Sequence, residues 1–362
     1  MASTLNLTGK SFIMNSIKTT KYDDPHRWVI FLCICLVYFF VYFHRVSPSV
    51  IVSDLISAFN TNATALGFMA SMYFYLYALE QPLVGFLADV IGPRKVIGYW
   101  SVIAAVGCFI FGLAPNIGWA SAGRALIGLG VGGVYVPAVK SFSQWFRPRE
   151  FATMVGLLMA VGNFGAIIAT TPLAWAAGAW GWRATFFIIG GITLALAFTT
   201  LKVTRDYSGT ADSVSRPAER PERHTRKYRS KIVRILTSMR FCLVATIFFG
   251  VYGTLITLQG LWATPFLMTV LGIERVDASN LNMLIPVGVI LGAPFIGWLT
   301  GRFGLAKARA LGTIVLIYAI TWIGIIWFHA QIGIWGLGAS LLVMGIAGGG
   351  FISTLWGFIQ ET

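Results

Sequence analysis

Ten apolar runs, each close to twenty residues long, follow one another along this chain and are separated by short polar or basic stretches. The hydrocarbon core of a bilayer is about 30 Å thick, and a helix needs about 20 apolar residues to cross it. The runs therefore predict ten membrane-spanning helices. They cover residues 28–50, 65–84, 96–114, 119–141, 152–175, 183–201, 240–265, 281–299, 309–328 and 332–357.

The composition supports a membrane protein, with the lipid bilayer as its surroundings. Only 11% of the residues are charged, whereas soluble domains carry roughly a quarter. The net charge of +14 would suit a nucleic-acid partner, but the basic residues lie in short loops between apolar runs, so no such partner is predicted. The four cysteines all lie in apolar runs and indicate small buried hydrophobes, with no disulfide and no metal cluster. They are Cys33, Cys35, Cys108 and Cys242.

The distribution of lysine and arginine predicts the orientation. A cytoplasmic amino terminus places nearly all of them on the cytoplasmic side, as membrane proteins prefer. The exceptions are Arg45 and Arg124 within spans, and Arg183 and Arg275 at the outer face. We therefore expect a cytoplasmic amino terminus. We also expect the membrane to be the inner membrane of a bacterium.

Four parts follow along the chain: a polar cytoplasmic tail at 1–27, six spans at 28–201, a basic linker at 202–239 and four spans at 240–362. Within the linker, residues 224–239 place apolar side chains among basic ones. This pattern predicts an amphipathic helix on the inner leaflet, attracted to anionic lipid. The alternative, a merely solvated linker, is favoured for residues 205–223.

The stretch from Gly85 to Lys95 is a tight polar turn between two predicted spans. Gly85 is expected to allow close backbone approach, and Gly92 with Pro93 ends the helix. Arg94 and the lysine that follows it hold this end at the cytoplasmic face. These features predict a loop at the inner membrane surface.

The pattern G-x-L-x-D-x-x-G-x-R-K in this stretch resembles the loop between helices two and three of the major facilitator superfamily of transporters. Val90 stands where an arginine is usual. The resemblance extends over Arg124–Gly133, Gln144–Glu150 and Gly181–Phe187. It implies an all-α membrane protein, a helical bundle with two pseudo-symmetric halves, close to the branch that carries anions and sugar phosphates. It also implies that Asp89 serves an inner gate, opposite an eleventh span.

A weaker repeat of the same stretch marks the second half. Gly297–Lys307 keeps the glycines, the leucine and the lysine, with Gly301 in place of Asp89. By that symmetry the second half should hold six spans, but four are present. Two interpretations are open, a fragment or a natural ten-span form. The first is favoured because the tenth run ends without a basic anchoring loop.

Arg45 lies in the first span, about 26 Å along the helix from Trp28. A charge inside a membrane normally faces a cavity or a partner. One interpretation is therefore a cation that binds an anion in a central cavity, with Tyr42 beside it. The other is an arginine that reaches up to the outer interface. The resemblance favours the first, because family members that carry organic anions often have an arginine here.

Arg124 lies in the fourth span at a similar depth. With Tyr135 it would add to an electropositive cavity, but bracing of the first span is the favoured interpretation. The glycines that follow Arg124 predict close packing of this span on its neighbours.

Glu80 is the acidic residue placed well inside a span, about 22 Å from the outer end. Low-dielectric surroundings favour the protonated form of a carboxyl group. Glu80 is therefore a candidate for proton coupling. The alternative is a neutral, hydrogen-bonded acid without a role in transport.

Polar and aromatic residues in spans seven and ten are further candidates for a cavity lining, although ordinary helix packing would also place them there. They are Tyr252, Thr254, Thr257, Gln259, Trp262 and Ser340. Neither span carries an arginine or lysine, which argues against a phosphate-ester exchanger.

These residues predict a monomeric secondary transporter that carries a small organic anion together with protons by alternating access. No cofactor, metal site or enzymatic activity is expected. The alternatives are a non-transporting sensor with the same fold and a truncated, inactive fragment. A drug exporter is a rival within the class, but it would prefer an acidic cavity for cations.

Overall fold

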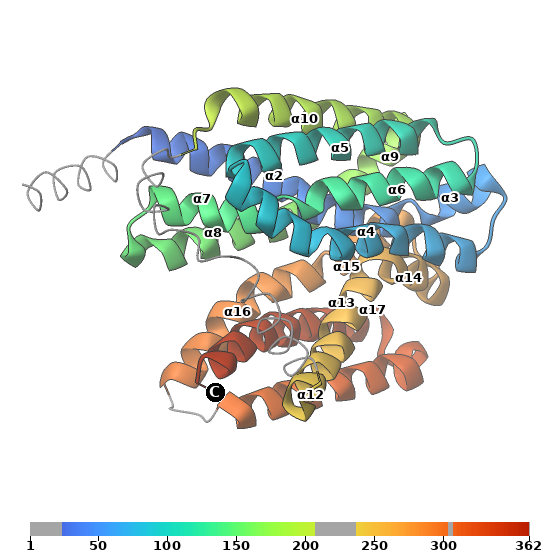
Figure 1. The fold of residues 1–362 in the computed structure, drawn as a ribbon. Coiled ribbons are helices and arrows are strands. Elements are labelled where there is room, and N and C mark those ends of the chain that lie inside the picture. Colours follow the sequence, from blue (N-terminus) through green and yellow to red (C-terminus); the bar gives the residue numbers. More distant parts are fainter. Residues whose placement is uncertain (1–23, 207–236, 303–306, 362) are drawn as a thin grey trace, which may run out of the picture. The chain divides into compact units, whose positions relative to one another are not determined.

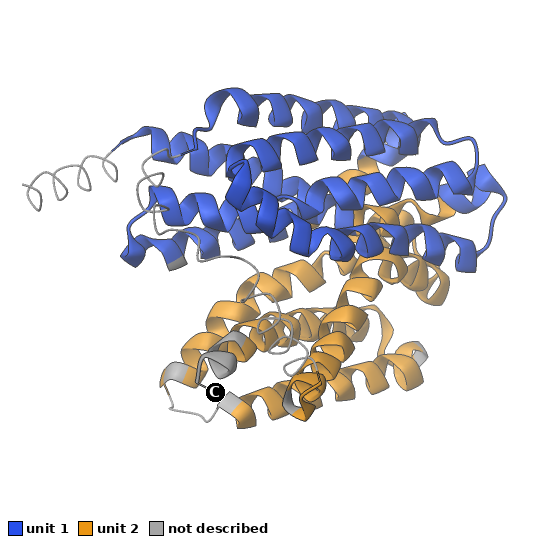
Figure 2. Cartoon of the chain, viewed as in Figure 1, with its two compact units in different colours: residues 1–45, 54–165, 176–207 blue, residues 46–53, 166–175, 208–362 orange. Residues whose placement is uncertain are grey.

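The computed structural model describes residues 24–206, 237–302 and 307–361, and all regular elements among them are helices (Figure 1). The predicted tail lies outside these residues up to residue 23, and the predicted amphipathic stretch 224–239 lies outside them up to residue 236. The chain forms two compact units that interleave in sequence (Figure 2). Unit 1 comprises Met1–Arg45, Asp54–Gly165 and Ala176–Tyr207, and unit 2 comprises Val46–Ser53, Ala166–Trp175 and Ser208–Thr362.

Nine helical segments among the described residues are long and apolar enough to cross a membrane. They are His26–Val50, Pro93–Leu113, Ile117–Trp145, Pro148–Ile168, Trp182–Val203, Phe241–Leu271, Arg275–Thr300, Ala308–His329 and Gln331–Leu355. Each overlaps a predicted span. The remaining prediction, 65–84, lies within helix α4 (Ala63–Val90), whose 28 residues extend about 42 Å. Its tyrosines and the polar pair Glu80 and Gln81 lower its hydropathy, so it is not among the nine.

Unit 1 is built from long helices, several of which lie side by side in Figure 1. Besides α4, the helices that lie wholly or partly in unit 1 are α2 (His26–Val46), α3 (Val52–Phe59), α5 (Pro93–Leu113), α6 (Ile117–Gly132), α7 (Tyr135–Trp145), α8 (Pro148–Ile168), α9 (Thr171–Trp180) and α10 (Trp182–Val203). Residues 46, 52–53, 166–168 and 171–175 of these helices belong to unit 2. Asn62 and Asn116 cap α4 and α6, because each side chain accepts a backbone N–H of the first turn. Gly92 has φ +91°, which turns the chain into α5 at Pro93.

The glycines of α6 let this helix approach its neighbours closely, as the sequence predicts. A Cβ atom on Gly128 would lie 2.1 Å from the carbonyl oxygen of Tyr73, and one on Gly130 would lie 2.2 Å from the backbone nitrogen of Ala104. At Gly85 the structure differs from the expectation. No described atom outside the adjoining backbone of its own helix lies within 4 Å of the place its Cβ would take, so no close backbone approach is seen there.

Unit 2 contains the turn η1 (Ser47–Val50) and the second half of the chain. Its elements are α12 (Met239–Phe248), η3 (Phe249–Gly253), α13 (Thr254–Thr257), η4 (Leu258–Trp262), α14 (Ala263–Leu271), α15 (Arg275–Asn282), α16 (Leu284–Arg302) and α17 (Lys307–Glu361). Both η3 and η4 are π-helical. α17 is broken at Gly333, which has φ +60° and lies near the start of the second of its two apolar segments, Ala308–His329 and Gln331–Leu355.

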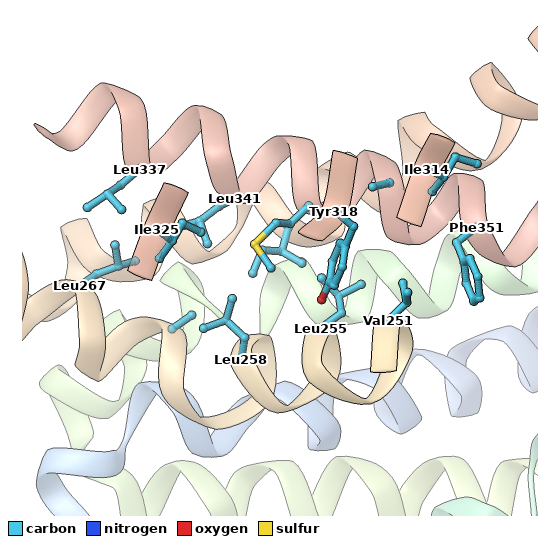
Figure 3. Close-up of a cluster of buried hydrophobic side chains, with 14 of the residues drawn as sticks. Val251, Leu255, Leu258, Leu267, Ile314, Tyr318, Ile325, Leu337, Leu341 and Phe351 are labelled. Carbon is cyan, nitrogen blue, oxygen red and sulfur yellow. The ribbon is translucent and has the colours of Figure 1, made fainter. Parts of the chain in front are cut away.

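The core of unit 2 is an apolar cluster between the π-helical span and α17 (Figure 3). Val251, Leu255 and Leu258 project from the span toward Tyr318 and Leu341 of α17. α16 and α17 also meet through glycines: a Cβ on Gly345 would lie 2.2 Å from the carbonyl oxygen of Ile285. Small residues at such contacts let membrane helices pack closely.

Candidate functional site

A group of aromatic rings around one arginine forms the candidate site in unit 1. Tyr38, Tyr42 and Arg45 share one face of α2 because they are spaced by four and three residues. Tyr77 of α4 and Tyr135 at the start of α7 complete what we call the tyrosine–arginine cluster. The rings of Tyr38 and Tyr42 are 5.5 Å apart, and those of Tyr38 and Tyr135 are 5.9 Å apart.

Arg45 is held within the cluster by its aromatic neighbours. Its guanidinium carbon lies 4.5 Å from the ring centre of Tyr42 and 5.9 Å from that of Tyr77. Such cation–π contacts stabilise a charge that has left water. The Arg45 residue is 9% exposed. A guanidinium group in this setting offers N–H donors in the geometry that carboxylates and phosphates accept.

Two hydroxyl groups of the cluster point toward α8. Those of Tyr38 and Tyr42 lie 3.5 Å and 3.8 Å from the sulfur of Met159. The cluster therefore joins α2, α4, α7 and α8. Met159 was not singled out from the sequence, because a methionine in an apolar run carries no signal of its own.

Arg124 occupies a different environment from Arg45. It is 0% exposed, and its Nη1 donates to the carbonyl oxygen of His44 at 2.8 Å. Its guanidinium carbon lies 4.8 Å from the ring centre of Tyr73, whose hydroxyl donates to the carbonyl of Val41 at 3.0 Å. Arg124 and Tyr73 thus hold α2 through its backbone, which is the bracing contact. The sequence alone favoured this interpretation, but it did not exclude the alternative that Arg124 lines an electropositive cavity.

The two arginines contact successive turns of α4. Arg124 lies over Tyr73 and Arg45 over Tyr77, and these two rings stack at 6.2 Å with an interplanar angle of 14°. Both cations therefore lie along one aromatic stripe. Only Arg45 retains exposed surface, so Arg45 is the better candidate for contact with a substrate.

Glu80 of α4 is 4% exposed and lies between α5 and α6. The indole nitrogen of Trp100 donates to its Oε2 at 2.6 Å. A Cβ on Gly132 would lie 1.9 Å from its Oε1, and this oxygen is buried without a hydrogen-bond partner among the described residues. The structure therefore places Glu80 at a junction of three helices.

The predicted gate motif is held by contacts that the sequence did not reveal. Lys140 in the middle of α7 donates to Asp89 at 2.6 Å. The backbone N–H of Arg94 donates to the carboxylate of Asp206 at 2.9 Å, and its side chain donates to the carbonyl of Leu201. The remaining residue of the motif, Lys95, is exposed.

Some of the second-half candidates meet at a cavity of about 290 Å³ in unit 2. Its lining consists of Phe249, Gly253, Thr254, Thr257, Leu258, Trp262 and Trp322. The Thr254 hydroxyl also lies 2.9 Å from that of Tyr318. The lining follows the two π-helical segments, and such segments occur frequently at functional sites.

The other second-half candidates lie elsewhere. The backbone carbonyl of Gln259 accepts from Asn282 at 3.2 Å. The hydroxyl of Ser340 donates to Gly336 on its own helix at 2.8 Å. The ring of Tyr252 packs on Phe248 at 5.2 Å. None of these three lines the cavity around Thr254.

The nine helical segments that are long and apolar enough to cross a membrane define a multi-pass helical membrane protein. Residues 34–362 match the family model described as Major Facilitator Superfamily, and the chain belongs to this family. The resemblance inferred from the Gly85–Lys95 motif is thereby confirmed. Because this is a family of transporters, membership also supports the expectation that the chain is not an enzyme.

Two curated relatives are similar to parts of the chain. The probable sulfoacetate transporter SauU of Cupriavidus necator is 30% identical over 168 residues, which are 46% of this chain and 39% of that protein. The hexuronate transporter of Escherichia coli K12 is 25% identical over 175 residues, 48% of this chain and 40% of that protein. These alignments span about two fifths of the length of each relative.

Among solved structures, the fold is similar to that of a bacterial homologue of the human lysosomal transporter Spinster, in an inward-facing, unoccupied conformation. The TM-score is 0.71 with 19% identity, over 92% of this chain and 75% of that chain. At this identity the similarity shows the fold alone. It confirms the all-α transporter fold predicted from the sequence.

Proposed function

We propose that the chain is a secondary transporter of a small organic anion, and that the guanidinium group of Arg45 binds the anionic group of the substrate. The observation that carries this proposal is the setting of Arg45: a nearly buried cation, held between aromatic rings of α2 and α4. Cations inside membranes are costly and normally mark a functional pathway.

The relatives support the same class of substrate. One is named for sulfoacetate and another for hexuronate, and both compounds are organic anions. A bidentate contact between arginine and a carboxylate or sulfonate would serve either of them. We further propose proton symport, with Glu80 as the coupling group, in a bacterial inner membrane with the amino terminus in the cytoplasm.

The test is uptake by the purified full chain in proteoliposomes under an imposed proton gradient. Radiolabelled glucuronate and sulfoacetate serve as probes. We expect accumulation of at least one of them. Arg45→Ala should reduce the apparent affinity roughly tenfold to hundredfold, the loss expected for a hydrogen bond to a charged group. Arg45→Lys should retain part of the activity, because lysine keeps the charge without the bidentate fork.

Arg149→Ala is the matched control, because it removes an exposed cation from the start of α8. It should leave uptake unchanged. Uptake by Arg45→Ala equal to that of the wild type would remove Arg45 from the substrate role. Binding of a probe without any flux would instead indicate a sensor and would overturn the transport proposal.

A further inference from the structure

The short helix α15 reaches segments of the first half of the chain through three of its residues. The side-chain amide of Asn282 donates to Ser49 Oγ at 3.3 Å, across 233 residues of sequence. Arg275 donates to Ser53 Oγ at 3.2 Å, and Asn280 accepts from the hydroxyl of Thr171 at 2.6 Å. All of these partners belong to unit 2 with α15.

Asn282 is the buried centre of this network. It is 0% exposed, and the same amide nitrogen lies 3.2 Å from the carbonyl of Gln259 and 3.2 Å from the hydroxyl of Thr264. One side chain thus links η1, η4, α14 and α15. Because the site is closed to water, loss of this donor would leave buried acceptors unsatisfied.

The hydrogen bonds of Asn282 lead, through Ser49, to the residue that follows Arg45 in the sequence. Ser49 is buried in η1, and its hydroxyl donates to the carbonyl of Val46 at 2.9 Å. Val46 is the last residue of α2 and directly follows Arg45. The hydrogen bonds therefore run from Asn282 through Ser49 to the end of the helix that carries the arginine. The boundary between the two units falls between Arg45 and Val46.

We infer that Asn282 is a positioning residue for Arg45, which it holds in place through Ser49 and the carboxyl end of α2. The significance for transport rests on the proposed function, in which Arg45 binds the anion.

The experiment measures Arg45 itself, without any substrate. The full chain in detergent is treated with phenylglyoxal, and the rate of Arg45 modification is followed by mass spectrometry. Hydrogen exchange of the amides in residues 46–51 is recorded in parallel. Asn282→Ala and Ser49→Ala should each raise both rates about 2- to 10-fold, the factor that corresponds to one net hydrogen bond. The double variant should exceed neither single variant by more than twofold, because both changes remove the same link.

Ser53→Ala is the matched control, since it removes the bond to Arg275 and leaves Ser49 in place; it should behave as the wild type. Equal rates of Arg45 modification in Ser49→Ala and Ser53→Ala would overturn the inference. If Asn282→Ala fails to fold, the comparison of Ser49→Ala with Ser53→Ala still tests it. In a second arm, glucuronate and sulfoacetate affinity is measured for each variant. Raised modification rates with no binding of either probe to the wild type would support the positioning role and overturn the proposed role of Arg45 as anion ligand.

Discussion

At the scale of single residues, Arg45 and Arg124 show how neighbours decide the role of identical side chains. Both lie within predicted spans at similar depth, and both contact a tyrosine of α4. Arg124 donates a hydrogen bond to the backbone of α2 and has no exposed surface. Arg45 lies over ring faces and remains partly exposed. These settings are why we propose that Arg124 stabilises the bundle and that Arg45 contacts the substrate.

Glu80 provides a prediction at this scale. Glutamine at position 80 is neutral, nearly the same size, and still offers a carbonyl oxygen to the indole N–H of Trp100. If Glu80 couples protons, Glu80→Gln should abolish uptake driven by a proton gradient. Exchange of labelled for unlabelled substrate across the same membrane should persist, because exchange needs no net proton movement. Proteoliposome flux assays in the two modes measure this difference.

The control for this prediction is Glu274→Gln, which neutralises an exposed acid just before α15. It should leave both flux modes at wild-type rates. Gradient-driven uptake that survives in Glu80→Gln would assign Glu80 to the alternative, a buried acid that only holds α4, α5 and α6 together.

At the scale of elements, close helix contacts depend on a few glycines. Gly128 and Gly130 place α6 directly against the backbones of α4 and α5. The same device recurs in unit 2, where Gly345 and Gly349 of α17 meet the backbone of α16. Dispersion and close packing, which hold membrane helices together, depend on such small side chains.

Gly130→Ala tests this packing. The added methyl group would lie 2.2 Å from the backbone nitrogen of Ala104 and 2.5 Å from the carbonyl of Trp100, so α5 and α6 must separate. We expect destabilisation of about 1–3 kcal/mol, the usual cost of overpacking. Thermal unfolding of the purified chain in detergent, followed by the loss of monodisperse protein, measures the change.

Gly191→Ala is the matched change, because Gly191 lies inside α10 and no described atom outside the adjoining backbone of that helix is within 4 Å of its Cβ position. Its unfolding temperature should equal or exceed that of the wild type, since alanine favours helix over glycine. Equal effects of both substitutions would show that the close contact at Gly130 contributes nothing to stability.

At the scale of the whole molecule, basic charge is concentrated in the stretches that we assign to the cytoplasmic side. Lys95 is exposed at the start of α5, whereas Asn60 is exposed between α3 and α4. The positive-inside rule places these two positions on opposite sides of the membrane. This is a property of the entire chain, because a single loop placed on the wrong side would invert its neighbours.

Cysteine labelling in whole cells tests the orientation. The natural cysteines 33, 35 and 108 are buried, and Cys242 is exposed, so Cys242→Ser gives a suitable background. In this background Asn60→Cys should react with a membrane-impermeant maleimide added outside. Lys95→Cys should react only after the membrane is opened. The reverse pattern would contradict the proposed cytoplasmic amino terminus.

The sequence by itself determined the spans, the helix end at Gly92 and the family. Hydropathy and capping are local properties that can be read over a few to twenty consecutive residues. Only the tertiary structure decided which polar side chains meet: Arg124 with the backbone of His44, Lys140 with Asp89, and Asn282 with Ser49. These partners are 51 to 233 residues apart. Their pairing depends on how the helices pack against one another, and hydropathy along the chain carries no record of that packing.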